Sequence, residues 1–176
     1  SDHNVLFELD GERALDVYKR YLGEYAEQLP GAGLLFPFEM LCKERDPIGV
    51  YRTVLAVDEA SGSLTLAGDI DPNGYLKLMH SSTDKLIDGA ENAAKMALGK
   101  ETGDESDTLA ILVSCVGRKI IMGDRVEEEV EAVAELCAAD TAITGFYSNG
   151  EISSTEAHGG CRLHNQTMTI SWIREA

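Results

Sequence analysis

Alternating apolar and polar positions divide much of the chain into short strand-like segments. These segments lie at 5–9, 38–43, 51–58, 63–69, 75–80, 108–115, 141–147 and 166–173. The stretch Glu59-Ala60-Ser61-Gly62 joins two of them in a way that is typical of an antiparallel hairpin. Because several strands follow one another directly, the pattern predicts an α+β fold. We expect a largely antiparallel or mixed β-sheet with about three main helices packed on it.

Apolar residues spaced by three and four positions predict the first two helices. The first is expected to begin at a cap on Asp10, with one apolar face made by Ala14, Tyr18, Tyr21 and Tyr25. The second is expected to begin at a cap on Thr83 and to run to about Leu98.

The third predicted helix begins at a capping box formed by Asp124 and Glu127. Its apolar face is expected to carry Val126, Val130, Val133 and Cys137. The glutamates at 127, 128, 129, 131 and 135 mostly occupy the other face. An acidic run of this kind is typical of a solvated helix surface.

The most continuous apolar run is TLAILVSC, at 108–115. It predicts a central strand that is covered on both faces. The strand ends at Ser114 and Cys115, and the chain then turns at Gly117 into a helical stretch. This placement predicts a buried Cys115.

The charge balance excludes some classes of partner. The 176 residues carry 31 acidic and 15 basic side chains, for a formal net charge of −16. Nucleic acids and anionic membrane surfaces require clustered cations, so neither is an expected partner. No apolar run approaches the roughly 20 residues of a membrane span.

The cysteines and the start of the chain indicate the cellular setting. The four cysteines contain no CxxC pair, and no export signal precedes them, so reduced thiols in the cytoplasm are expected. The polar start SDHNVLFELDGERA is not a signal peptide and lacks an initiator Met. We interpret residues 1–176 as a single domain taken from a longer protein or processed.

Three polar stretches at strand ends are candidates for a binding site. In SCVGRK (114–119), Arg118 offers a planar fork that suits a carboxylate or phosphate, although the residues alone favour a structural carboxylate as its partner. In GFYSNGEI (145–152), a turn around Asn149 places Tyr147 and Glu151 close together. Glu151 there can accept from a ligand amine or face water.

The third stretch is RLHNQT (162–167), which carries His164 and Asn165 at the start of the last strand. Nearby, His158 and Cys161 lie in a glycine-rich loop, so a haem or metal contact involving these residues is an alternative. The histidines and cysteines show no zinc spacing. Motifs for nucleotide binding, metalloproteases and serine hydrolases are absent from the sequence.

Five stretches, in order, resemble the C-terminal domain of the FIST family, a sensory domain of signalling proteins. They are LAGDIDPNGYLKLM (66–79), TDKLIDGAENAAKMAL (83–98), LVSCVGRKIIMG (112–123), ITGFYSNGEI (143–152) and LHNQTMTI (163–170). Together they cover most of the chain from Val50 onward.

The resemblance implies an intracellular input domain that binds a small ligand such as an amino acid. It also implies a FIST N-terminal domain as partner, and as output a histidine kinase, a cyclic-dinucleotide enzyme or a chemotaxis module. If the strand ends converge, Arg118 would take the ligand carboxylate and Glu151 its ammonium, while Tyr147 and Asn165 would fix its orientation. Cys115, Asn149 and His164 complete the candidate set.

Three alternatives compete with this interpretation. A haem-dependent nitric oxide sensor would use His158, Cys161 or His164, although the sequence requires no cofactor. A scaffold would pack against the N-terminal domain or form a homodimer without a ligand of its own. An enzyme with Cys115 as nucleophile and His164 as base ranks last, because the strand buries Cys115 and no catalytic motif accompanies it.

Overall fold

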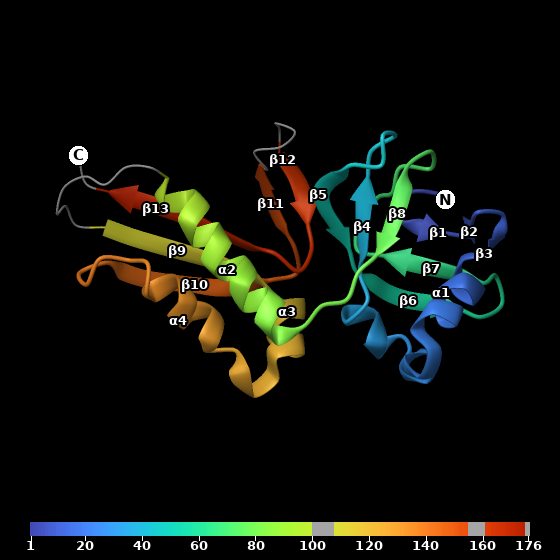
Figure 1. Ribbon diagram of the computed structural model, residues 1–176, viewed down its shortest axis with the longest axis horizontal. Helices are drawn as coiled ribbons and strands as arrows, with labels where there is room; N and C mark the ends of the chain where they lie inside the picture. Colours follow the sequence, from blue (N-terminus) through green and yellow to red (C-terminus); the bar gives the residue numbers. More distant parts are fainter. Residues whose placement is uncertain (100–107, 155–160, 175–176) are drawn as a thin grey trace. The chain divides into compact units, whose positions relative to one another are not determined.

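The computed structural model describes residues 1–99, 108–154 and 161–174 (Figure 1). The chain forms two compact units. Unit 1 comprises Ser1–Ser81 and Ser154–Asn165, and unit 2 comprises Ser82–Ser153 and Gln166–Ala176. The described residues contain four α-helices and a larger number of short strands in mostly antiparallel sheets. The predicted α+β fold class is therefore confirmed.

Unit 1 contains two three-stranded antiparallel sheets. The first has the order β1-β7-β6, and the second the order β5-β4-β8. The strands are β1 (Val5–Leu6), β7 (Ser63–Leu66), β6 (Val54–Asp58), β5 (Pro47–Arg52), β4 (Phe38–Leu41) and β8 (Tyr75–Leu78). The hairpin predicted around Ser61 is confirmed, since β6 and β7 pair antiparallel. Strand β12 (Cys161–His164) lies beside β5 in the same unit (Figure 1).

The predicted first strand, 5–9, is divided in two. After β1, a short hairpin is formed by β2 (Glu8–Leu9) and β3 (Glu12–Arg13). Its two central residues, Asp10 and Gly11, have φ angles of 51° and 82°. Positive φ at both positions is the mark of a two-residue hairpin turn with Asp-Gly chemistry. Asp10 therefore belongs to a turn, and the prediction that it caps a helix is wrong.

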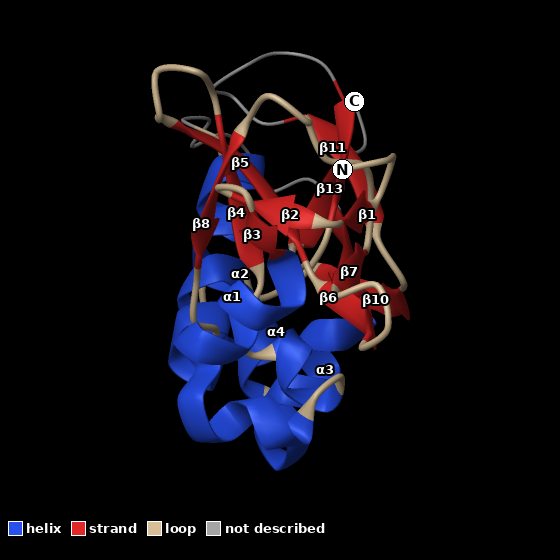
Figure 2. Cartoon of the chain, turned by 90° about the vertical axis from the view of Figure 1, so that its right-hand side faces the viewer, coloured by secondary structure: helices blue, strands red, loops and turns tan. Residues whose placement is uncertain are grey.

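Helix α1 (Ala14–Leu22) begins directly after this hairpin and packs against β7 (Figure 2). It leads into two 3-10 helices, η1 (Gly23–Gln28) and η2 (Gly31–Leu34). Its buried residues are Ala14, Leu15, Tyr18 and Leu22. Tyr21, expected on the buried face, is 73% exposed. Ala14, Tyr18 and Leu22 lie four positions apart and form one buried stripe of the helix. Leu15 and Leu22 therefore occupy the buried positions that were predicted for the later tyrosines.

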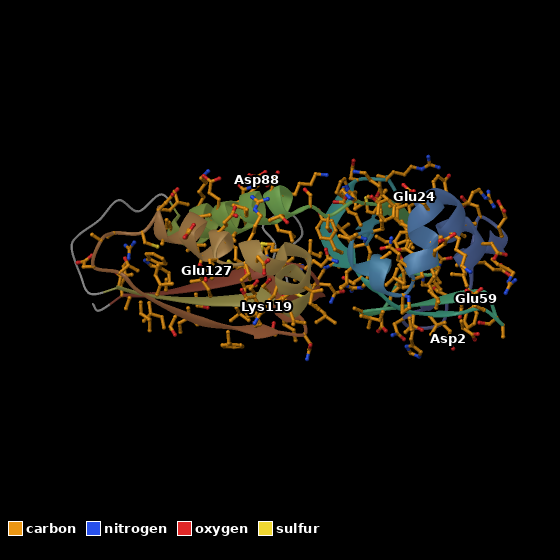
Figure 3. The ribbon with its side chains drawn as sticks, turned by 90° about the horizontal axis from the view of Figure 1, so that it is seen from below. Asp2, Glu24, Glu59, Asp88, Lys119 and Glu127 are labelled. Atoms are coloured by element: carbon orange, nitrogen blue, oxygen red, sulfur yellow. The ribbon has the colours of Figure 1, made fainter. Side chains whose placement is uncertain are left out.

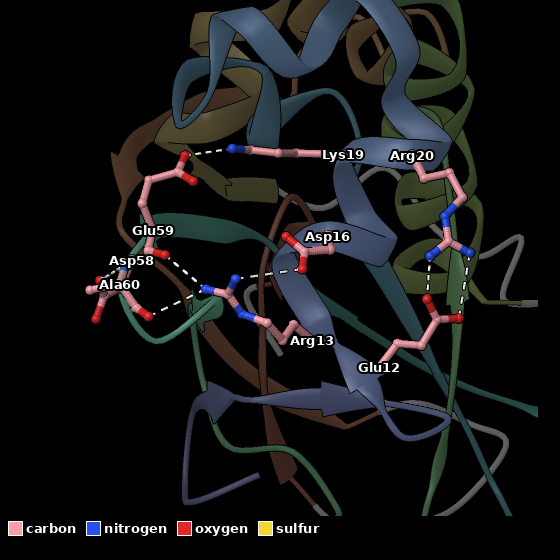
Figure 4. A network of polar contacts seen from close by, with 8 residues as sticks. All are labelled: Glu12, Arg13, Asp16, Lys19, Arg20, Asp58, Glu59 and Ala60. Carbon is pink, nitrogen blue, oxygen red and sulfur yellow. Dashed lines mark hydrogen bonds and ion pairs between the residues drawn. The ribbon is translucent and has the colours of Figure 1, made fainter.

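Exposed ion pairs surround the start of α1 (Figure 4). Lys19 Nζ lies 2.5 Å from a carboxylate oxygen of Glu59, and Arg20 pairs with Glu12. Arg13 donates to the Glu59 carbonyl at 2.8 Å. Lys19 thus joins α1 to the β6–β7 turn, Arg13 joins β3 to the same turn, and Arg20 joins α1 to β3.

Unit 2 is built on a mixed sheet of order β10-β9-β13. The strands are β9 (Thr108–Cys115), β10 (Ala142–Ser148) and β13 (Met168–Arg174). Strand β10 runs parallel to β9, whereas β13 runs antiparallel to it. The central position predicted for 108–115 is confirmed. Strand β11 (Glu151–Ser154) follows the turn after β10.

The helices of unit 2 are α2 (Thr83–Leu98), α3 (Val116–Met122) and α4 (Glu128–Ala134), with the 3-10 turn η3 (Gly123–Arg125) between the last two. Figure 3 shows them gathered on one face of the sheet. Ala110 and Leu112 of β9 face them and are buried, whereas Ile111 and Val113 of the opposite face are only half-buried. The prediction that both faces of β9 are covered is therefore wrong.

The helix starts predicted in unit 2 are only partly correct. The side chain of Ser82, one residue before the predicted Thr83, accepts from the Lys85 amide at 3.5 Å and caps α2. Helix α4 starts at Glu128 with no side-chain cap, so the capping box of Asp124 and Glu127 does not form. No helix of the described residues combines the length and apolar character of a membrane span.

Candidate functional site

The centre of unit 2 holds a buried polar cluster, which we call the Glu129 cluster. Its members are Ser114, Arg118, Glu129 and Tyr147, from β9, α3, α4 and β10 respectively. Glu129 is fully buried, and only 3% of the Arg118 side chain is exposed. The strand order places Ser114 directly opposite Tyr147, with both side chains on the helix-covered face of the sheet.

The Glu129 carboxylate collects donors from every other member of the cluster. Arg118 donates from Nε to one oxygen at 2.9 Å, and its Nη2 lies 2.9 Å from the same oxygen as an ion pair. The Tyr147 hydroxyl donates to the other oxygen at 2.8 Å, and Ser114 Oγ lies 3.2 Å from both. The second role of Arg118 is to donate at 2.7 Å to the Leu86 carbonyl of α2. The cluster therefore connects helices α2, α3 and α4 to strands β9 and β10.

The cluster neutralises its own charge. A buried guanidinium and a buried carboxylate each carry a large desolvation cost, and their close pairing offsets it. Burial, together with the hydrogen bond to Glu129, raises the pKa of Tyr147 to about 12. Lys119 lies 4.9 Å from the centre of the Tyr147 ring, which adds a cation–π contact at the edge of the cluster.

Glu129 is the residue that the sequence interpretation missed. The acidic run was assigned to a solvated surface, and Glu127 does project outward (Figure 3), but Glu129 is buried. Helix α4 starts at Glu128, and its buried residues are Glu129 and Val133, which lie four positions apart on one face. Val130, predicted to be apolar core, is 41% exposed.

Glu151 forms a separate polar site at the start of β11. It is only 3% exposed, and its two oxygens accept from Ser148 Oγ at 2.6 Å and from Thr167 Oγ1 at 2.7 Å. Earlier in β10, Gly145 allows close approach to β9, because a Cβ there would lie 2.0 Å from the Leu112 carbonyl oxygen. Within the described residues, no lysine, arginine or histidine forms an ion pair with Glu151.

The remaining candidates of unit 2 differ in their exposure. Cys115 is 5% exposed, as predicted, and its backbone N–H donates to the Thr167 carbonyl at 3.0 Å. Asn149 is exposed in the turn between β10 and β11. A buried thiol at the end of a central strand is a poor nucleophile unless its thiolate is stabilised.

His164 and Asn165 belong to unit 1, where both are 2% exposed. Asn165 donates to the His164 carbonyl at 3.1 Å. Of the alternative haem residues, His158 lies outside the described residues, and Cys161 is exposed. The part of the chain that the structure describes contains no group of three or more His, Cys, Asp or Glu that could hold a metal ion.

The comparison with known families supplies the identification. A family model described as FIST C domain matches residues 14–154. The chain belongs to the FIST C family. No curated protein and no solved structure matches it. The FIST C match extends over residues of both units and includes Arg118, Glu129, Tyr147 and Glu151.

Membership confirms the resemblance seen in the sequence and gives the protein a general role. FIST C is a sensory domain of signal transduction, and it is not a known enzyme family. The buried groups described above are therefore best considered as parts of a sensory module.

Proposed function

We propose that this FIST C domain senses a small molecule that carries an ammonium group, with an amino acid as the class of ligand. The observation that supports this proposal is the state of Glu151. It is a buried carboxylate with two hydroxyl donors and, among the described residues, no cationic partner.

The physical argument rests on the cost of burying an unpaired charge. Two hydroxyl groups satisfy part of the hydrogen-bonding capacity of a carboxylate, which has about four acceptor positions. They do not neutralise its charge, so a buried carboxylate is strongly stabilised by an approaching cation. A primary ammonium offers three N–H donors and fits the remaining positions.

The other candidates take different parts in the proposal. Arg118 and Tyr147 hold β9 and β10 in place through Glu129, since their polar atoms are already bonded there. Cys115 and Asn149 are proposed to border the ligand at Glu151. His164 and Asn165 belong to unit 1 and have no part in the proposed Glu151 site.

The signalling context completes the proposal. We place the domain in the cytoplasm, next to a FIST N-terminal domain and upstream of an output module. The output candidates are a histidine kinase, a cyclic-dinucleotide enzyme and a chemotaxis module. The large negative charge of −16 is compatible with ligands and protein partners, and it disfavours nucleic acid.

Isothermal titration of the chain against a panel of amino acids tests the proposal. Glu151→Gln keeps the shape of the side chain and removes its charge, so it should weaken binding of the best ligand about tenfold or more. Glu24→Gln is the matched control, because Glu24 is exposed (Figure 3), and it should leave the affinity unchanged. Binding that Glu151→Gln leaves intact, or no binding by any amino acid, would contradict the proposal.

A further inference from the structure

Arg52 is a second buried arginine, located in unit 1 at the end of β5. Only 8% of it is exposed. Nε donates to the Asp69 carbonyl at 2.9 Å, and Nη1 donates to the carbonyls of Tyr51 and Leu163 at 3.0 Å each. These three acceptors lie on different segments and fix the guanidinium in one orientation.

The charge of Arg52 is not balanced by a carboxylate in contact with it. Among the described residues, no Asp or Glu forms an ion pair with Arg52. Burial lowers the pKa of Arg52 from its ordinary value; the more distant charge of Asp69 opposes this effect, and that of Arg162 adds to it. Backbone carbonyls orient a cation, but they supply only partial negative charge.

The guanidinium keeps one nitrogen free. Nη2 has no hydrogen-bond partner among the described residues, since the bonds of Arg52 involve only Nε and Nη1. In the described chain, the enclosed side-chain atoms without a hydrogen-bond partner are Thr141 Oγ1, Asn165 Oδ1 and Trp172 Nε1. Nη2 of Arg52 is not one of them, so it is not enclosed. Nη2 therefore reaches the surface with two N–H donors available.

Gly68 makes room for this arrangement. Its φ is +139°, and a Cβ added there would lie 3.0 Å from Cζ and Nε of Arg52. A side chain at position 68 would press on the guanidinium, so the glycine allows Arg52 to occupy its place.

We propose that Arg52 forms a binding site for a small monocarboxylate. Nη2 of Arg52 takes a carboxylate oxygen, while Nε and Nη1 stay bonded to the backbone carbonyls that orient the guanidinium. Because only one nitrogen of the fork is free, the site suits a single negative charge better than a phosphate dianion. The assignment rests on the proposed function in one respect, namely that the domain binds small molecules.

Titration with two probes tests this site in the 176-residue chain. The probes are acetate and glycolate, two small monocarboxylates. At constant ionic strength, both should shift backbone amide resonances of β5 and β12 saturably. Arg52→Gln should weaken both about tenfold or more.

Arg20→Gln is the matched control, since it removes one positive charge from an exposed ion pair. It should leave both affinities unchanged. If Arg52→Gln does not fold, the Nε–H resonance of Arg52 in the unaltered chain decides the question: a saturable shift supports the site. The absence of any shift, or binding that survives Arg52→Gln, overturns it.

The outcome is separable from that of the proposed function. Neither acetate nor glycolate has an ammonium group, so neither tests Glu151. Amino-acid binding that depends on Glu151 while both acids fail to bind would overturn the Arg52 site alone. Acid binding that depends on Arg52 while no amino acid binds would support the site and overturn the Glu151 proposal.

Discussion

The two units each bury an arginine, and the two arginines are satisfied in opposite ways. In unit 2, Arg118 contacts a fully buried carboxylate and donates as well to a helix carbonyl. In unit 1, Arg52 is held by backbone carbonyls and keeps Nη2 free. The first arrangement is complete without a ligand. The second fixes a cation in place and leaves part of its binding capacity unused.

Whether the donors of a buried arginine are already occupied distinguishes a structural role from a binding role more clearly than the residue type does. From the sequence, Arg118 was the natural choice for a ligand carboxylate, because it follows a central strand at a turn. Its guanidinium is instead occupied by Glu129. The free donor lies in unit 1, on Nη2 of Arg52.

The largest expected effect comes from breaking the internal pair of unit 2. Glu129→Gln leaves the buried charge of Arg118 unpaired, so it should lower the free energy of unfolding by about 3–5 kcal/mol. Urea denaturation followed by fluorescence measures this change, because Trp172 is the single tryptophan and belongs to unit 2.

The neighbouring Glu128→Gln is the control for that substitution. Glu128 forms its ion pair with Arg125 on the surface, so its loss should leave the urea midpoint almost unchanged. Equal midpoints for Glu129→Gln and Glu128→Gln would show that the buried pair does not stabilise unit 2.

Removing the arginine of unit 1 should have a smaller effect on stability. Arg52→Gln withdraws donors from three backbone carbonyls but leaves no buried carboxylate unpaired, so we expect a loss of about 2 kcal/mol. Amide hydrogen exchange of β5 measures it. A loss as large as that of Glu129→Gln would mean that Arg52 is as essential structurally as the buried pair, and the comparison would fail.

Tyr147→Phe should cost about 1 kcal/mol, because Glu129 keeps its bonds to Arg118 and Ser114. The variant also has a pH signature. The folded pKa of Tyr147, about 12, lies above its ordinary value of 10.0, so between these values the unfolded chain loses a proton that the folded chain retains. The contribution of Tyr147 is therefore fully present below about pH 10 and decreases as pH rises toward 12.

Urea midpoints measured by Trp172 fluorescence at several pH values check this prediction. The stability difference between the unaltered chain and Tyr147→Phe should shrink steadily above about pH 10. A constant difference across that range would show that the hydroxyl does not titrate as the buried geometry requires.

The smallest effect is expected for the exposed pairs of α1. Arg20→Ala should change the thermal unfolding midpoint only slightly, since the Arg20–Glu12 pair is exposed (Figure 4). Thermal unfolding at low and high salt measures the change, which should vanish in high salt. A large, salt-independent loss would show that these pairs resemble the Glu129 cluster.

The sequence predicted the fold class and most of the strands, because alternation and turn residues act locally. It identified β9 as the central strand and placed α2 within one residue. It failed at Asp10 and Asp124, where the same residue types serve both turns and helix caps.

The candidate site was harder to predict for a physical reason. The partner of a buried charge is set by which faces meet in three dimensions, and Glu129 shares the buried face of α4 with Val133, four positions further on. The sequence does not single out Arg52 as a candidate. Its nitrogen Nη2 is free because three carbonyls on separate segments accept from Nε and Nη1 alone, and this arrangement exists only in the fold. Glu151 and Asn165 were identified because each directly follows a strand end or turn.

One titration compares the two arginines directly. Acetate is added to the isotope-labelled chain at constant ionic strength, and the side-chain Nε–H resonances of Arg52 and Arg118 are followed together. We predict a saturable shift at Arg52 and none at Arg118, whose donors are occupied by Glu129 and Leu86. A shift confined to Arg118, or no shift at Arg52, would contradict the account.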